Sequence, residues 1–251
     1  MRKRIFTLLL ALVAIASGAW AQETYNLWVG SVQVTSANAS NVLGDGKVSY
    51  NSETSTLTFN NATITQSVVG NTLKDYHKVL IQSNGIDLNI TGNVTIEGGD
   101  CSIYVLNGNL KLDGNITLEH YLLVDNGNLT IDSGVLKVNK SDTNTYNTNV
   151  YIECNGNISI GENVGKVETT GYIFSKGTIT INSALTITEP VGAEIIDIDK
   201  YGYKDCICYK NTTTTAFGVV IEKVAKYNLW VGDTQVTDAN KDDVLGDGKV
   251  T

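Results

Sequence analysis

The chain has 251 residues, of which 42% are hydrophobic, and its 18 basic and 26 acidic side chains give a formal net charge of −8. Three of the basic residues are Arg2, Lys3 and Arg4, so the rest of the chain carries 15 basic and 26 acidic side chains, a net charge of −11, and no arginine. Nucleic acid and phosphate recognition depend on basic contacts and guanidinium groups. We therefore expect no nucleic-acid partner.

Residues 1–21 have the layout of a cleavable secretory signal. Basic residues come first, an apolar run over residues 5–15 follows, and small residues precede Gln22. The apolar run is short for a membrane span, which makes an uncleaved anchor the less favoured alternative. We predict a protein that is secreted or held at the cell surface, with no membrane insertion after signal cleavage.

Residues 22–77 contain two pairs of alternating runs. Alternating apolar residues flank a glycine turn at Gly30, and two further alternating runs, at residues 47–50 and 56–59, flank a polar loop. This pattern predicts two β-hairpins. A stack of repeats exposes its first member, so we interpret the hairpins as a cap rather than a binding site, with residues 65–77 leading into the repeats.

One sequence pattern is repeated five times within residues 78–187. A β-rich run ends in a glycine turn and is followed by two short apolar alternations. The second run begins at intervals of 22, 19, 29 and 21 residues, at Leu88, Leu110, Leu129, Ile158 and Ile179. This spacing, with period-two alternation and no run long enough for a helix, predicts an all-β fold. We expect a right-handed parallel β-helix with three-strand coils and an N-terminal β-hairpin cap.

The repeats predict two ladders of stacked side chains. Residues two positions after the start of the second run share one phase and should point into the core: Ile90, Leu112, Ile131, Ile160 and Ile181. The residues before the repeated glycine are asparagines in four repeats and should bond to one another at one corner: Asn84, Asn107, Asn126 and Asn155.

The strand before each glycine suggests a binding surface. The residues four positions before glycine are predicted to face inward: Ile81, Tyr104, Leu123, Ile152 and Ile173. The residues five positions before it would then face outward as an apolar strip: Leu80, Ile103, Leu122, Tyr151 and Tyr172. Such a strip needs a cover or a partner. Residues 189–225 or a cap hairpin would be the cover, and a polysaccharide would be the partner.

The longest repeat adds a polar loop over residues 139–149 beside this strip. Loops on a rigid scaffold often carry binding residues, and this one contains Asp142 and Tyr146. The predicted ligand-binding residues are therefore Tyr146, Tyr151 and Tyr172, with Asp142 nearby.

Glu97 and Glu119 each follow the third run of consecutive repeats. In register they would lie about 5 Å apart, which suits a retaining glycosidase pair or a calcium site. We favour two solvated residues at strand ends, so calcium is a weak candidate and no catalytic residue is predicted.

The four cysteines are expected to be buried free thiols. Cys101 and Cys154 fall two repeats apart, and Cys206 and Cys208 share one face of a strand, which suits no direct disulfide. The cysteine spacing and two isolated histidines also predict no zinc site.

Residues 188–225 are expected to close the first module, because residues 226–251 begin a second. Tyr227 to Thr251 repeats Tyr25 to Ser49 with 18 of 25 positions identical. The second copy stops within a hairpin, so we expect the chain to be part of a longer array.

The opening Tyr-Asn-Leu-Trp-Val-Gly of residues 25–30, together with the repeats, resembles the modules of secreted bacterial parallel β-helix proteins. That resemblance implies a carbohydrate-binding or surface protein and brings no catalytic motif. We expect a non-catalytic, glycan-binding or adhesive surface module. The alternatives are a structural spacer that displays other domains and a glycoside-active β-helix enzyme. Without an arginine, resemblance to pectate lyases and polygalacturonases fails.

Overall fold

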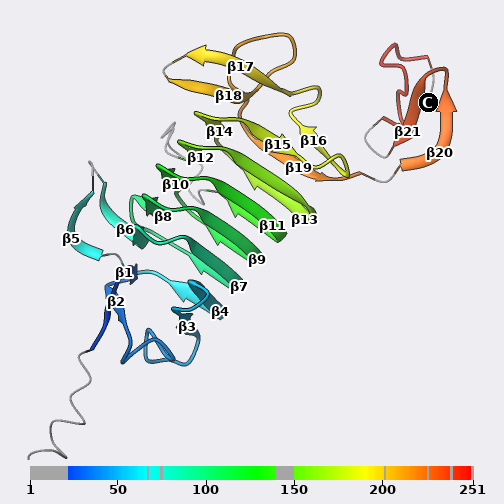
Figure 1. Cartoon of the computed structure of the whole chain (residues 1–251). Coiled ribbons are helices and arrows are strands. Elements are labelled where there is room, and N and C mark those ends of the chain that lie inside the picture. The colour runs from blue at the N-terminus through cyan, green and yellow to red at the C-terminus, as the bar shows by residue number, and fades with distance from the viewer. Residues whose placement is uncertain are drawn as a thin grey trace, which may run out of the picture.

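A computed structural model describes residues 22–66, 68–73, 76–139, 150–200, 202–224, 226–237 and 240–249. These residues form an all-β protein without a helix, so none of the described segments is a helix able to cross a membrane. Their strands make two long mixed sheets, sheet A and sheet B, and one separate hairpin (Figure 1).

Sheet A contains ten strands. Its order is β17-β18-β14-β12-β10-β8-β6-β1-β2, with β5 also pairing with β6. The strands are β1 (Thr24–Val29), β2 (Val32–Thr35), β5 (Val68–Leu73), β6 (Tyr76–Asn84), β8 (Cys101–Leu106), β10 (Tyr121–Asp125), β12 (Tyr151–Cys154), β14 (Tyr172–Ser175), β17 (Glu194–Lys200) and β18 (Tyr203–Cys208).

Sheet B contains nine strands in the order β16-β19-β13-β11-β9-β7-β4-β3, with β15 also pairing with β13. They are β3 (Val48–Asn51), β4 (Thr56–Ile64), β7 (Leu88–Ile96), β9 (Leu110–Leu118), β11 (Leu129–Val138), β13 (Ile158–Thr169), β15 (Ile179–Ile181), β16 (Leu185–Glu189) and β19 (Val219–Lys223). The separate hairpin pairs β20 (Lys226–Val231) with β21 (Thr234–Thr237).

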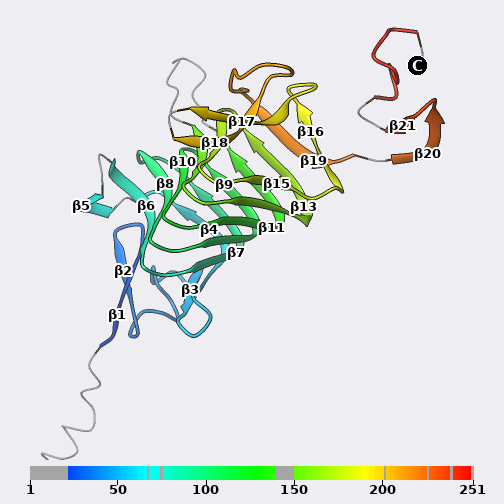
Figure 2. The same cartoon turned by 45° about the horizontal axis from the view of Figure 1, so that its top comes forward.

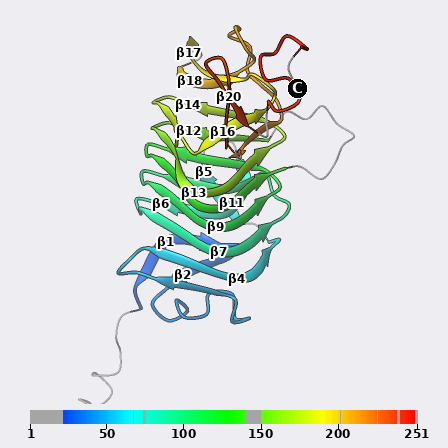
Figure 3. The ribbon, with the colours of Figure 1, turned by 90° about the vertical axis from the view of Figure 1, so that its right-hand side faces the viewer.

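From β6 to β15 the chain passes alternately from sheet A to sheet B (Figure 2). Strands β6, β8, β10, β12 and β14 are parallel neighbours in sheet A, and β4, β7, β9, β11, β13 and β15 are parallel neighbours in sheet B. Successive repeats therefore stack on one another (Figure 3). One core of apolar side chains drawn from both sheets runs through the stack.

In the first four repeats the two apolar runs after the glycine turn form one strand, where the sequence predicted two. In the fifth repeat they remain separate, as β15 and β16. Strand β7 covers both runs without interruption and takes a left-handed residue, Gly92 (φ 91°), in its middle. Gly114 and Gly134 hold the equivalent positions in β9 and β11. In the first three repeats a glycine bends the strand here without ending its hydrogen bonding. Each of the first four repeats therefore has two strands, and the fifth has three.

The predicted inward ladder is confirmed. Its five residues are consecutive Cα partners, and the first four are at most 2% exposed: Ile90, Leu112, Ile131, Ile160 and Ile181. At the end of the ladder, Ile181 is half-buried and packs against the core.

The predicted inward and outward rows of sheet A are wrong for the second and third repeats, and the predicted outward position of Leu80 in the first repeat is wrong as well. Ile103 and Leu122, expected to face outward, pack in the main core, and Tyr104 and Leu123, expected to face inward, lie in a second cluster outside it. Leu80 also belongs to the main core. The expected directions hold for Ile81, Ile152, Ile173, Tyr151 and Tyr172.

The error comes from the length of the corner. In the second and third repeats, Asn107 (φ 54°) and Asn126 (φ 59°) take a left-handed conformation just before glycine, where the first repeat uses Gly85 (φ 72°). The pairing of Asn84 with Leu106 confirms this alignment. In those two repeats the residue equivalent to Gly85 is the asparagine and not the glycine after it. Positions counted back from the glycine are therefore displaced by one residue, and a displacement of one residue exchanges the two faces of a strand.

The asparagine ladder forms across three repeats. Asn107 Nδ2 donates to Asn84 Oδ1 at 3.3 Å, and Asn126 Nδ2 donates to Asn107 Oδ1 at 3.0 Å. Asn155 donates instead to the carboxylate of Asp125, because the shorter corner of its repeat places it beside that residue.

We predict that Asn126→Ala lowers the free energy of unfolding by about 1–2 kcal/mol. The variant loses an exposed hydrogen bond and places alanine in the left-handed region. Asn126→Gly is the control, because glycine accepts this conformation and loses only the bond. Urea denaturation checks the prediction, and equal stability of Asn126→Ala and the wild type would contradict it.

Both ends of the stack are closed by antiparallel strands. At the N-terminal end β1 pairs with β6 and β3 pairs with β4, so the two expected hairpins lie on the first repeat. This places Leu27 and Val29 in the core, with no exposed surface. At the other end β18 extends sheet A beyond β14, and β19 extends sheet B beyond β13.

Candidate functional site

A row of aromatic rings lies on the outer face of sheet A, near its C-terminal end. This aromatic strip consists of Tyr151 on β12, Tyr172 and Phe174 on β14, Tyr203 at the start of β18, and Phe217 before β19. Ring centroids are separated by 6.4 Å for Tyr151 and Phe174, 5.4 Å for Tyr172 and Phe174, 4.9 Å for Phe174 and Tyr203, and 4.4 Å for Tyr172 and Phe217. The rings form one connected surface.

Strand alternation directs these side chains outward. In β14, Ile173 and Ser175 are buried while Tyr172 and Phe174 are half-buried, and β12 repeats the pattern with Ile152 buried. Tyr151 and Tyr172 are partners in the parallel register, so the scaffold fixes their backbones one strand spacing apart.

The strip continues into a buried cluster toward the N-terminal end. Tyr121 stacks on Tyr151 with ring centroids 4.1 Å apart, and it packs with Val79, Cys101, Tyr104 and Leu123. All five residues of this cluster are at most 7% exposed, whereas Phe217 at the other end is 44% exposed. The half-buried and exposed rings of the strip therefore lie over β12, β14, the start of β18 and the segment before β19.

Polar groups border the exposed rings. Tyr203 Oη donates to Glu153 Oε1 at 2.8 Å, and Lys176 Nζ lies 5.9 Å from the centre of the Tyr203 ring. Burial raises the pKa of Tyr172, so its hydroxyl stays protonated at neutral pH. The strip thus combines flat apolar faces with a carboxylate, an ammonium group and phenolic hydroxyls.

The structure brings together two of the four predicted ligand-binding residues, Tyr151 and Tyr172. Tyr146 and Asp142 lie outside the described residues. Phe174 was missed, although it lies two residues after Tyr172 and must share its face. Tyr203, on β18, and Phe217, just before β19, belong to residues 189–225, which were considered only as a cover. No sequence periodicity connects them to β14.

Glu97 and Glu119 follow equivalent ends of β7 and β9, as expected. Each backbone amide donates to the preceding repeat, Glu97 N to Ile64 O and Glu119 N to Ile96 O. The carboxylate of Glu119 accepts the amide of Gly98 at 2.5 Å, which gives it a backbone partner and a structural role. Among the described residues no group of three or more His, Cys, Asp or Glu side chains is placed to hold a metal.

The four cysteines are free and buried, as predicted. Burial raises the pKa of the Cys206 thiol to about 12 and also raises the pKa of Cys101. Both thiols are therefore protonated at neutral pH and are poor nucleophiles.

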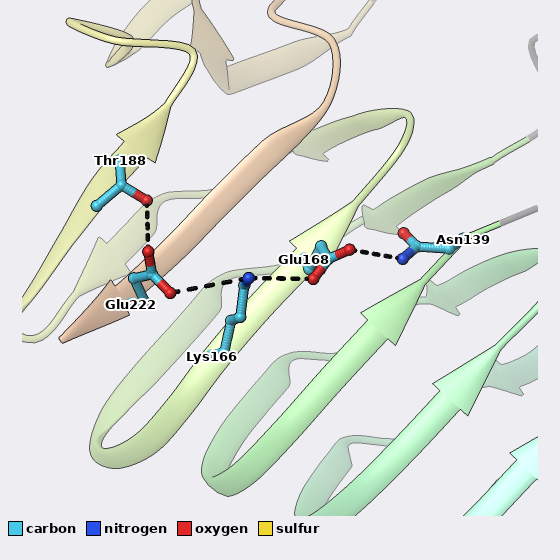
Figure 4. A network of polar contacts seen from close by, with 5 residues as sticks. All are labelled: Asn139, Lys166, Glu168, Thr188 and Glu222. Carbon is cyan, nitrogen blue, oxygen red and sulfur yellow. Dashed lines mark hydrogen bonds and ion pairs between the residues drawn. The ribbon is translucent and has the colours of Figure 1, made fainter.

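Sheet B carries a polar network on its outer face (Figure 4). Glu168 accepts Asn139 Nδ2 at 2.8 Å and lies 3.2 Å from Lys166 Nζ, which is 3.8 Å from Glu222. Glu222 also accepts the Thr188 hydroxyl at 3.1 Å. These contacts connect the end of β11 through β13 and β19 to β16, so the network joins the last parallel strands to the antiparallel ones.

We predict that this network makes stability depend on pH through Glu168. The hydrogen bond from Asn139, and then Lys166, lowers the pKa of Glu168 in the folded protein. A lowered folded pKa stabilises the protein above the ordinary glutamate pKa of about 4.3, and that contribution is lost as the pH falls through the folded value.

The wild type should therefore have a higher melting temperature than Glu168→Gln at pH 7, and the difference should shrink as the pH falls below about 4. Glu162→Gln, an exposed position on the same strand, is the control and should show a smaller difference. A gap between wild type and Glu168→Gln that stays constant from pH 7 to pH 3 would contradict the assignment.

Comparison of the chain with protein-family models, with curated proteins and with solved structures gave no match. No relative therefore indicates a ligand for the aromatic strip.

Proposed function

We propose that the stacked repeats form a β-solenoid of the right-handed parallel β-helix type, and that the protein is a secreted or cell-surface, non-catalytic module that binds an extended polysaccharide along the aromatic strip. The parallel pairing of five successive strands in sheet A and six in sheet B supports the solenoid. Chain passage from one sheet to the other in every repeat supports it as well.

The arrangement of the Tyr172 and Phe174 rings is the main support for polysaccharide binding. Both rings are half-buried on one strand, and neighbours on β12, β18 and the segment before β19 hold them in place. An aromatic face that is fixed before binding loses little conformational entropy when an apolar sugar face stacks on it. Rings held side by side on neighbouring strands suit an extended chain, and Glu153 and Lys176 border the rings with groups that hydrogen-bond to hydroxyls.

The negative charge of the protein favours a neutral polysaccharide over an anionic one. Residues after position 21 carry a net charge of −11, and the Glu153 carboxylate, which borders the strip, is already bonded to Tyr203. A polyanionic ligand would be repelled by this field, so the proposed ligand is a neutral polysaccharide.

The duplicated hairpin favours a second candidate, a structural spacer in which modules follow one another. In that case the strip would serve only for packing. A glycoside-active enzyme has less support, because the Glu119 carboxylate is engaged by the backbone amide of Gly98.

Native gel electrophoresis in gels that contain soluble polysaccharides tests the proposal. A panel of neutral glucans, mannans, xylans and galactans is compared with polygalacturonate as the anionic control. We expect at least one neutral polymer to slow the protein and polygalacturonate to leave its mobility unchanged. Unchanged mobility in every neutral polymer would reject polysaccharide binding and favour the spacer.

A further inference from the structure

Exposure changes sharply on the outer face of sheet A between β10 and β12, which are neighbours in the sheet (Figure 1). One row of Cα partners crosses this boundary through Tyr104, Leu123, Glu153 and Phe174, on β8, β10, β12 and β14. Tyr104 is 1% and Leu123 7% exposed, whereas Glu153 and Phe174 are half-buried. The row is therefore covered as far as β10 and accessible from β12 onward.

A second row of side chains changes at the same place. Tyr121 on β10 is 7% exposed, whereas Tyr151 on β12 and its Cα partner Tyr172 on β14 are half-buried. Two rows that change between the same two strands define an edge across the aromatic strip. The covered part over β8 and β10 is the closed side of the strip. It lies among the central repeats, away from the C-terminal strands.

Packing and hydrogen bonds tie the closed side to the strand that carries Tyr151. The Tyr121 ring stacks on the Tyr151 ring with centroids 4.1 Å apart and 22° between the ring planes. Tyr104 Oη donates to Asp125 Oδ2 at 3.3 Å, and the same carboxylate accepts Asn155 Nδ2 from the end of β12. The closed side is thus built into the fold beside Tyr151.

An extended sugar chain can lie on the strip in two directions. Parallel to the strands it would contact the rings of a single strand, Tyr172 and Phe174. Across the strands it would contact rings on β12, β14 and β18 in turn, at about 4.8 Å per strand. The second direction contacts more aromatic surface. It also leads the chain to the closed side at Tyr151.

A sugar inside a polymer has a neighbour on each side. A sugar stacked on Tyr151 has room for a neighbour toward β14 only, because the covered residues of β10 lie on the other side. We propose that the strip binds the end of a neutral polysaccharide chain, with the terminal sugar on Tyr151 and the chain extending over β14 toward β18. This inference rests on the polysaccharide binding proposed above and specifies the part of the polymer that is bound.

Titration calorimetry of the wild-type protein with chains of different length tests the inference. Linear polymers of the neutral panel are partly hydrolysed and separated by length, so that the number of chains in each fraction is known. We expect one protein molecule to bind per chain in every fraction that binds, with an affinity per mole of chains that does not change as the chains lengthen. A number of bound protein molecules that rises in proportion to chain length would overturn the inference.

The two proposals fail in distinguishable ways. Binding along the whole chain would overturn end recognition and leave polysaccharide binding intact, whereas no binding of any fraction of any polymer would reject both. Tyr151→Ala/Tyr172→Ala is the control that assigns the measured sites to the strip, and it should bind every fraction about 30- to 100-fold more weakly. Full affinity in this variant, with one molecule per chain, would place the chain end elsewhere and overturn the inference.

Oxidative footprinting locates the terminal sugar. The shortest fraction that binds should protect Tyr151 from hydroxyl radicals as strongly as a long fraction does, because both place their last sugar beside the closed side. Tyr25, in the N-terminal hairpin, should be equally reactive with and without either fraction. Protection of Phe217 with no protection of Tyr151 would overturn the placement of the chain end.

Discussion

Gly134→Ala is expected to lower the free energy of unfolding by several kcal/mol. Gly134 has a φ of 78°, and a Cβ added there would lie 2.0 Å from the carbonyl oxygen of Gly114 in the preceding repeat. The left-handed conformation costs alanine about 1–2 kcal/mol, and displacing packed backbone typically adds about 1–3 kcal/mol. The neighbouring atom is backbone, so it cannot move aside without disturbing the parallel register of β9 and β11.

Gly98→Ala is a closely matched control, because Gly98 has the same φ of 78° but nothing within 4 Å of an added Cβ. It should therefore lose only the conformational part, about 1–2 kcal/mol. Urea denaturation measures the free energy of unfolding of both variants. The difference between their losses is the cost of placing a Cβ against the backbone of the preceding repeat. Similar losses in the two variants would mean that the repeats are not packed backbone to backbone at this corner.

Loss of the central rings is expected to abolish most polysaccharide binding. Each aromatic ring that stacks on a sugar should contribute about 1 kcal/mol or more, so Tyr151→Ala/Tyr172→Ala should weaken binding by about 30- to 100-fold. The rings lie on the outer face and the core beneath them is unchanged, so the variant should keep its circular dichroism spectrum.

The control for this variant is Tyr25→Ala, which removes a half-buried tyrosine ring from the N-terminal hairpin. Affinity for the polysaccharide that slows the wild type, measured by titration calorimetry, should be unchanged in Tyr25→Ala. Full affinity in a folded Tyr151→Ala/Tyr172→Ala protein would remove these residues from the site.

The sequence was most informative where the chain repeats itself. The inward ladder from Ile90 to Ile181 was predictable, because period-two alternation and a fixed distance from the start of each run determine both face and register. The directions of Tyr104 and Leu123 were not, because they depend on whether asparagine or glycine takes the left-handed residue of the corner. That difference changes the length of the turn between the two sheets by one residue, but the amino-acid composition of the strand does not reveal it.

The candidate site was predictable only in part for a related reason. Tyr151 and Tyr172 belong to the repeats and share a face by periodicity. Tyr203 and Phe217 reach the same face through antiparallel strands after the repeats, and their contacts with Phe174 and Tyr172 depend on the path of that segment in space. The sequence also identified the duplicated hairpin, whose strands β20 and β21 pair in the register of β1 and β2.

Oxidative footprinting tests most directly whether the aromatic strip is a polysaccharide platform. Hydroxyl radicals label the wild-type protein alone and with a saturating concentration of the neutral polymer that slows it most in gels, and mass spectrometry measures oxidation of each ring. We predict that the bound polymer protects Tyr172, Phe174 and Phe217 and leaves the oxidation of Tyr25 unchanged. A bound polymer that leaves Tyr172 and Phe174 as reactive as in the free protein would contradict the account.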